Sequence, residues 1–134
     1  MGDSMTEAAG LRHIIRMEDV EAYSPANHLG TVNRRLIGKE TVGASNIEVV
    51  LGVVTKDGGA QPHMHPGIEQ VVYVLEGQAR AEVGGEVGEM GPGDTCYFPP
   101  DTSHSFVAIS DTPVKCLVIY SPPYQESPER GVAQ

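Results

Sequence analysis

The stretch from His63 to Gly77, HMHPGIEQVVYVLEG, constrains the fold more than any other part of this 134-residue chain. His63 and His65 are two residues apart, and residues at i and i+2 of a β-strand point to the same face of a sheet. Residues 70–75 are rich in apolar, aromatic and β-branched side chains, and Glu76-Gly77 follows them as a turn. The stretch therefore predicts a buried strand beside two imidazoles that converge on one point, as they do in metal sites.

Two histidines alone are a weak signal for a metal, because such pairs also occur on exposed strands. Further ligands are available nearby: the side chain of Glu69 or Gln70, and His104, which follows a turn-rich segment at 91–103. A strand alternates its faces, so only one of Glu69 and Gln70 can face an ion held by the histidines. The combined pattern predicts a site for one divalent metal ion.

The rest of the chain has the pattern of short strands separated by turns rich in Gly, Pro and Asp, without helical periodicity. Strands are predicted at 11–17, 31–37, 46–55, 70–75, 78–83, 87–90, 95–98, 104–110 and 114–121, with a loop at 18–30 and a turn at 56–59. This pattern indicates an all-β barrel or sandwich. We expect one domain at 11–124, a disordered N-terminal segment at 1–10 and a loose C-terminal tail at 125–134.

With these residues in place, the chain resembles the cupin superfamily, whose small metalloproteins form a double-stranded β-helix. The first motif of that family is a Gly, then H-x-H, then Glu or Gln, and a Gly after six more residues. It is matched here by Gly58 or Gly59, His63, His65, Gln70 and Gly77. The resemblance implies a single-domain cupin barrel, also called a jelly roll.

The second motif is a Gly, five residues, Pro, then a turn and His, and it is matched by Gly93, Pro99 and His104. Both motifs occur in the right order, and the resemblance extends over about residues 34–120. The sequence departs from the pattern in places: Asp101 stands where the turn Gly is expected, and Ala108 replaces the closing Asn.

The third ligand is assigned by its spacing to the strand-ending Gly77, since counting back seven residues gives Gln70. Glu69 is then interpreted as an outward, solvated acid. The resemblance thus implies a metal site made of four residues, which are His63, His65, Gln70 and His104. A mixed histidine and amide set fits Mn, Fe, Ni, Cu or Zn, and nothing in the sequence chooses among them.

A neutral amide ligand leaves the +2 charge of the ion uncancelled, which makes the ion a stronger Lewis acid and attracts anions. We therefore expect a metal-binding cupin that acts on a small, anionic organic molecule by lyase, isomerase or decarboxylase chemistry. A metal-dependent dioxygenase and a non-catalytic small-molecule binding or sensor protein are the alternatives. The motifs contain no general base, so catalytic residues stay unassigned.

Charge and targeting features restrict the partners and location. The 18 acidic and 9 basic residues give a formal charge of −9, which disfavours nucleic acid and anionic membranes as partners. Residues 1–10 lack the features of a signal peptide and no stretch has the length of a membrane span, so we expect a cytoplasmic protein. Cys96 and Cys116 fall within predicted strands and are expected to be buried thiols, with a disulfide between them as the alternative.

Other residues receive simpler interpretations. His28 is interpreted as a surface or turn residue, with closure over the barrel mouth as the alternative. Arg34 and Arg35 point to opposite faces of a strand, so at most one could enter the cavity. The segment 11–17, with Ile14 and Ile15, has no strand partner within the barrel, and we expect it to contact a second subunit in a homodimer, as is common among small cupins.

Overall fold

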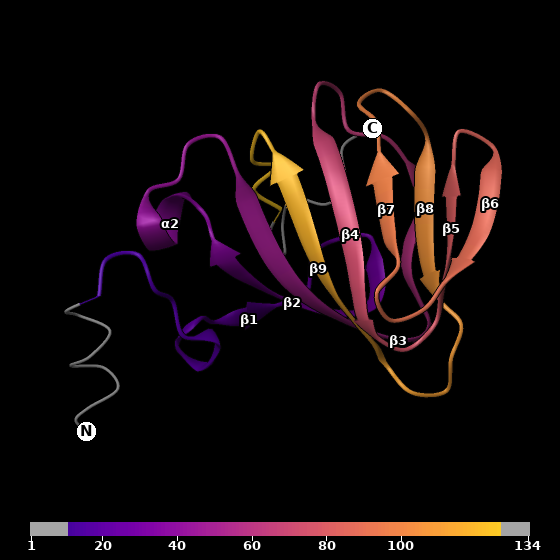
Figure 1. Ribbon diagram of the computed structural model, residues 1–134, viewed down its shortest axis with the longest axis horizontal. Coiled ribbons are helices and arrows are strands. Elements are labelled where there is room, and N and C mark those ends of the chain that lie inside the picture. The colour runs from indigo at the N-terminus through magenta and orange to yellow at the C-terminus, as the bar shows by residue number, and fades with distance from the viewer. Residues whose placement is uncertain (1–10, 127–134) are drawn as a thin grey trace.

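The computed structural model describes residues 11–126, which consist mainly of strands and loops (Figure 1). The strands are β1 (Ala22–Tyr23), β2 (His28–Ile37), β3 (Glu48–His63), β4 (Glu69–Glu76), β5 (Ala79–Val83), β6 (Glu86–Met90), β7 (Thr95–Phe98), β8 (His104–Ala108) and β9 (Val114–Ser121). Two short helical turns, η1 (Met17–Asp19) and α2 (Lys39–Val42), precede β1 and follow β2. The prediction of an all-β fold is confirmed.

The strands form one nearly closed antiparallel barrel, in the order β6-β5-β8-β3-β9-β4-β7, with β2 paired to β3 and β1 paired to β2. Strand β3 joins the two ends of the barrel, because its first half pairs with β9 and its last residues pair with β8. The same strand pairs with β2 along most of its length. In Figure 1, β9, β4 and β7 lie next to one another, which follows the hydrogen-bonded order.

The core lies inside the barrel, where the period-two alternation of the strands directs their apolar side chains. In β4, for example, Val72 and Val74 are buried, whereas Tyr73 between them is exposed. The main cluster is built from aliphatic, aromatic and thiol side chains: Val54, Val72, Val74, Ala79, Ala81, Met90, Phe98, Phe106, Ala108, Val114 and Cys116. Five members of this cluster also line the cavity described below: Val54, Val72, Phe98, Phe106 and Cys116.

One predicted turn is absent, because residues 56–59 belong to the continuous strand β3. The Gly-rich sequence instead accompanies an irregularity in the pairing of β2 with β3. Asp57 and Gly59 have positive φ angles of 66° and 126°. A Cβ atom on Gly59 would lie 2.0 Å from the carbonyl oxygen of Phe106, so the close approach of β8 requires a glycine here.

Other boundaries also differ from the predictions. Residues 11–16 form no strand, and the predicted loop at 18–30 contains η1, β1 and the start of β2. The predicted tail at 125–134 is wrong for Glu126, which is 2% exposed, because its side chain packs inside the barrel. The rest of that tail, and the segment 1–10, lie outside the described residues. Asp101 takes the place of the expected turn Gly with a φ of 60°, a conformation that Asp tolerates better than most residues.

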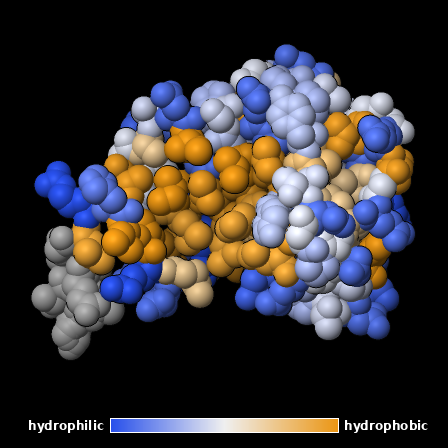
Figure 2. Space-filling model, viewed as in Figure 1, coloured by the Kyte–Doolittle hydropathy of each residue, from blue (hydrophilic) through white to orange (hydrophobic). Residues whose placement is uncertain are grey.

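Apolar side chains also gather on the outer face of the barrel, over β2, β3, β9 and β4 (Figure 2). Leu51 of β3, Leu117 of β9 and Tyr73 of β4 lie opposite one another across these strands. Leu51 and Leu117 are half-buried, and Tyr73 is 38% exposed. Within residues 11–126, no helix is long and apolar enough to cross a membrane.

Candidate metal centre

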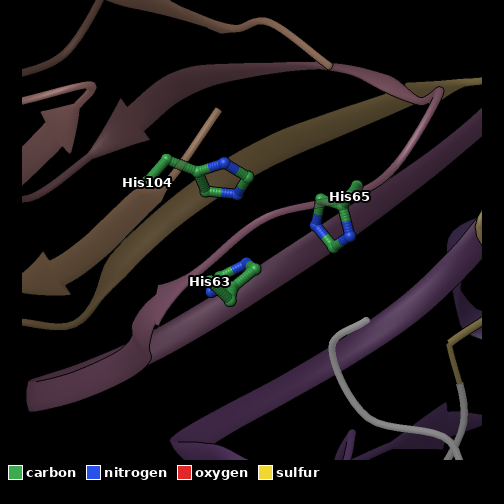
Figure 3. A group of neighbouring side chains, drawn as sticks. All are labelled: His63, His65 and His104. Atoms are coloured by element: carbon green, nitrogen blue, oxygen red, sulfur yellow. The ribbon is translucent and has the colours of Figure 1, made fainter. Parts of the chain in front are cut away.

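Three histidines meet inside the barrel, and two of them come from paired strands (Figure 3). His63 is the last residue of β3, and it lies opposite His104, the first residue of β8. His65 follows two residues after His63, just beyond the end of β3. The ring centroids are 4.3 Å apart for His63 and His104, 4.9 Å for His63 and His65, and 5.1 Å for His65 and His104. One nitrogen from each ring lies within 4.8 Å of the others, which is the spacing that a shared ion needs.

Strand β4 directs an amide toward this group and an acid away from it. Gln70 is 7% exposed and lines the same cavity as His63 and His104. Glu69, the preceding residue, is exposed, and its Oε1 accepts a hydrogen bond of 3.1 Å from the hydroxyl of Tyr97. The alternation expected from the sequence therefore leaves Gln70 on the cavity side.

The buried polar atoms of this group lack hydrogen-bond partners within the described part of the chain. They are both ring nitrogens of His65, Nε2 of His104 and Oε1 of Gln70. A buried polar atom without a partner costs roughly 1–3 kcal/mol, so several in one place call for a ligand. Imidazole nitrogens and an amide oxygen are suitable donors for a divalent transition metal ion, and the residues fit such an ion.

Backbone carbonyls orient two of the rings. Nδ1 of His63 lies 2.5 Å from the carbonyl oxygen of Gln61, and Nδ1 of His104 lies 3.3 Å from that of Thr102. An imidazole that donates a hydrogen bond from Nδ1 keeps its lone pair on Nε2. The Phe98 ring stacks on His104 at 4.1 Å between centroids and 3° between planes, which restricts the ring further.

The same burial keeps the imidazoles neutral. Burial lowers the pKa of His65 to about 3, with additional repulsion from His63 and His104. Burial also lowers the pKa of His104 to about 4, and lowers that of His63. All three rings are therefore unprotonated near neutral pH, and their lone pairs are available for a metal.

His63, His104 and Gln70 line a cavity of about 50 Å³. That volume holds a few water molecules or the reacting end of a larger molecule, since one water needs roughly 10–15 Å³ on this scale. Most of the remaining wall is apolar and consists of Val54, Ala60, Val72, Phe98, Phe106, Cys116 and Val118. The lining contains no Lys or Arg among the described residues, and its one carboxylate belongs to Glu126.

His28 also lines this cavity, and its ring centroid lies 6.3 Å from that of His63. His28 is half-buried and contributes to the cavity wall, which agrees with the alternative interpretation rather than with that of a surface or turn residue. The residues around His28 do not indicate whether it lies on the surface or at the cavity. Its place at the cavity is set by the pairing of β2 with β3, in which His28 lies opposite Ala60.

Neither arginine of β2 enters the cavity. Arg35 Nε lies 2.8 Å from Oε2 of the buried Glu48, and Arg35 Nη1 lies 2.7 Å from the exposed Glu40. Arg34 donates to the carbonyl oxygen of Val20 at 2.5 Å. Both guanidinium groups thus bind the protein itself rather than a cavity ligand.

The segment after β9 supplies residues that the sequence did not point to. The Tyr124 ring lies 4.6 Å from His65, and the Tyr120 ring of β9 lies 5.7 Å from it. The Tyr120 hydroxyl donates to Oε1 of Glu126, 3.3 Å away. Residues 124–126 follow Pro122-Pro123 and look like part of a tail in the sequence. No local pattern therefore indicates that Tyr124 and Glu126 are buried.

The two thiols behave as expected for small apolar side chains. Cys116 is buried and Cys96 is half-buried, and both are free cysteines. Burial raises the pKa of Cys116 to about 12 and also raises that of Cys96. Neither thiol is activated as a nucleophile.

Known proteins resemble this chain in sequence and in structure. The family described as Cupin domain matches residues 50–120. The polyketide synthase CurC of Streptomyces cyaneus is 28% identical over 116 residues, which cover 87% of this chain and 75% of that protein. An uncharacterized protein of Methanocaldococcus jannaschii is 39% identical over 62 residues, which cover 46% of this chain and only 50% of that relative.

Among solved structures, the polyketide cyclase RemF from Streptomyces resistomycificus superposes with a TM-score of 0.73. It is 26% identical, and the match covers 92% of this chain and 87% of RemF.

Proposed function

Since the chain belongs to the Cupin domain family, we propose that it holds one divalent metal ion on His63, His65, Gln70 and His104. We propose further that it acts there on a neutral carbonyl compound of the β-keto type, in an aldol-type ring closure. This assignment is a specific form of the Lewis-acid lyase chemistry expected from the sequence.

One observation carries the proposal: Nε2 of His104 and Oε1 of Gln70 lie without hydrogen-bond partners in the wall of a largely apolar cavity, and the two unpaired ring nitrogens of His65 lie next to His104. A divalent ion bound to these atoms would act as a Lewis acid that polarises a carbonyl oxygen. The apolar walls exclude water, and a low-dielectric surrounding strengthens electrostatic interactions within the cavity.

The charges around the cavity argue for a neutral substrate rather than the anionic one expected from the sequence. No Lys or Arg lines the cavity within the described residues, and the carboxylate of Glu126 would repel an anion. A ketone or β-diketone enters without charge and develops negative charge only when a proton next to its carbonyl is removed. The apolar wall suits the carbon skeleton of such a molecule.

Two relatives support the substrate class. CurC carries the name polyketide synthase and RemF that of polyketide cyclase, and each match covers more than four fifths of this chain. The cavity of about 50 Å³ would receive the reacting end of a polyketide chain, with His28 at the mouth.

The proposal is tested by ring closure of a synthetic linear polyketide thioester with protein loaded with Zn²⁺. We expect ring closure that depends on the metal and is lost in the double variant His63→Ala/His104→Ala. Glu69→Gln is the matched control, because this exposed carboxylate lies outside the cavity, and it should keep full activity. Binding of the thioester without any ring closure would contradict the enzyme proposal and favour the binding or sensor protein.

We also propose that the protein assembles as a homodimer. The apolar outer face over β2, β3, β9 and β4 is a surface of the kind that a second copy can cover (Figure 2). Ile14 and Met17, in the segment first expected to contact a partner, are 60% and 45% exposed. Light scattering should give twice the monomer mass for the full chain, and less for a chain beginning at Gly30. A monomer in both cases would contradict the proposal.

A further inference from the structure

We propose that Glu126 is the general base of this site, and that it removes the proton next to the carbonyl group of the substrate. The inference rests on the proposed function and deepens it, because the sequence motifs contain no base. It is carried by the position of a buried carboxylate in the wall of the histidine-lined cavity.

Glu126 shares the cavity wall with two of the histidines. The residue is 2% exposed and lines the cavity together with His63 and His104. Tyr120 links the two groups, since its hydroxyl contacts Oε1 of Glu126 and its ring packs edge-on against His65. A substrate with its carbonyl oxygen at the histidines would therefore place the neighbouring carbon on the side of Glu126.

The partners of the carboxylate are all neutral. Oε2 accepts hydrogen bonds from the Tyr23 hydroxyl at 2.9 Å and from Nδ2 of Asn33 at 2.5 Å, and Oε1 accepts one from Tyr120 at 3.3 Å. Burial and the charge of Glu126 raise the pKa of both tyrosines, which therefore remain protonated donors. Oε1 has the longer and weaker hydrogen bond, so it is the oxygen better able to accept a proton from a substrate.

No cation pairs with this carboxylate among the described residues. Arg35 donates instead to the backbone carbonyl oxygen of Glu126. Burying a carboxylate without a paired cation is costly, and such groups concentrate at functional sites.

The backbone around Glu126 is held by a second buried acid. Oε1 of Glu48 accepts the backbone N–H groups of Tyr124 and Gln125, each at 3.0 Å. Oε2 of Glu48 lies 2.8 Å from Nε of Arg35. These contacts position the carboxylate as a catalytic group requires, since a shift of about 0.5 Å already loosens a site.

The proposed step needs only the substrate and the Glu126 carboxylate. The C–H bond next to the carbonyl breaks, its proton passes to Oε1 of Glu126, and its electron pair forms the enolate. The enolate carbon then forms the new C–C bond to a second carbonyl carbon of the same molecule. The C=O π bond of that carbonyl breaks, its electron pair moves to the oxygen, and this oxygen takes the proton back from Glu126. The carboxylate is regenerated, and no other reactant is needed.

The experiment counts protons when benzoylacetone, a β-diketone, binds to the protein loaded with Zn²⁺. Calorimetry near neutral pH, in buffers of different ionisation enthalpy, measures the protons released per diketone bound. In the native chain, Glu126 keeps the proton of the bound enolate, so we expect release close to zero. In Glu126→Gln the amide cannot accept it, and about one proton should appear in the buffer. Glu126→Asp should release none but bind the diketone more slowly.

Controls separate the possible failures. Glu69→Gln should match the native chain, while zinc content and thermal unfolding verify that Glu126→Gln is folded. Release of about one proton by the native chain would overturn the role of Glu126 but leave the proposed function standing. This result does not depend on whether the Gln variant folds. Equal release by the folded Gln variant and the native chain would overturn it in the same way. No binding of benzoylacetone to the native chain would overturn the proposed function, and this inference with it.

Discussion

Replacing Glu48 by Gln tests how strongly the buried ion pair of Glu48 with Arg35 stabilises the fold. Glu48 is fully buried, and its two oxygens bind different partners: Oε1 accepts two backbone N–H groups, and Oε2 pairs with Arg35. A Gln side chain keeps one oxygen for the backbone but presents an amide N–H₂ group, a donor, to the guanidinium group. The variant should therefore keep most of the backbone contacts and leave the Arg35 charge without its buried partner.

The expected loss follows from the burial of the pair. Removing one partner of a buried ion pair costs roughly 3–5 kcal/mol, because the remaining charge stays desolvated. Arg35 keeps a second carboxylate in Glu40, and its own side chain is 14% exposed, so we place the loss near the lower limit, at about 3 kcal/mol. For a chain of this size, such a loss lowers the melting temperature by roughly 10 °C.

Glu40→Gln is the matched control, because it removes the other carboxylate from the same guanidinium group. The Glu40 side chain is 55% exposed, and exposed ion pairs are worth about 0–1 kcal/mol. Urea unfolding at neutral pH, with a common m value, measures both free energies of unfolding. Equal losses for the two variants would refute the reasoning that burial determines the strength of this contact.

Two further predictions concern the metal centre. Gln70→Ala should weaken zinc affinity by at least about tenfold, whereas Glu69→Gln should leave it unchanged, and competition with a chelator measures both; the reverse order would place the acid in the site. The unfolding free energy of metal-free protein should fall as the pH drops below about 6.5. Imidazoles of the unfolded chain bind protons below that pH, whereas burial in the folded chain holds the pKa of His65 at about 3 and that of His104 at about 4. Between about pH 4 and pH 6.5 the unfolded state binds more protons than the folded state, so stability rises with pH. An unfolding free energy, measured with urea, that stays constant over this pH range would contradict the prediction.

Local patterns in the sequence were sufficient for the strands and for the histidine cluster. Alternation along a strand predicted that only one of Glu69 and Gln70 faces inward, and the spacing to Gly77 selected Gln70, which is buried. His104 was found because its spacing from a turn-rich segment follows a known motif. The segment 56–59 was misread as a turn, since Gly and Asp with positive φ occur in strand irregularities as well as in turns. The strand predicted at 11–17 and the loop predicted at 18–30 were also wrong in part.

Contacts between distant parts of the chain could not be predicted in this way. Glu126 meets Asn33 and Tyr23 across 93 and 103 residues, and nothing in the residues around Glu126 indicates those partners. His28 reaches the barrel mouth through the register of β2 against β3, which is set by the whole sheet. The principal catalytic proposal therefore depends on the tertiary fold rather than on a motif.

The central claim is that His63, His65, Gln70 and His104 bind one divalent metal ion. Elemental analysis of protein purified without chelators, and then titrated with Zn²⁺, tests it most directly. We predict about one ion per chain for the native protein and for Glu69→Gln, and almost none for His63→Ala/His104→Ala, with circular dichroism verifying that the double variant is folded. A folded double variant that keeps a full equivalent of metal would contradict the account, because the ion would then lie elsewhere.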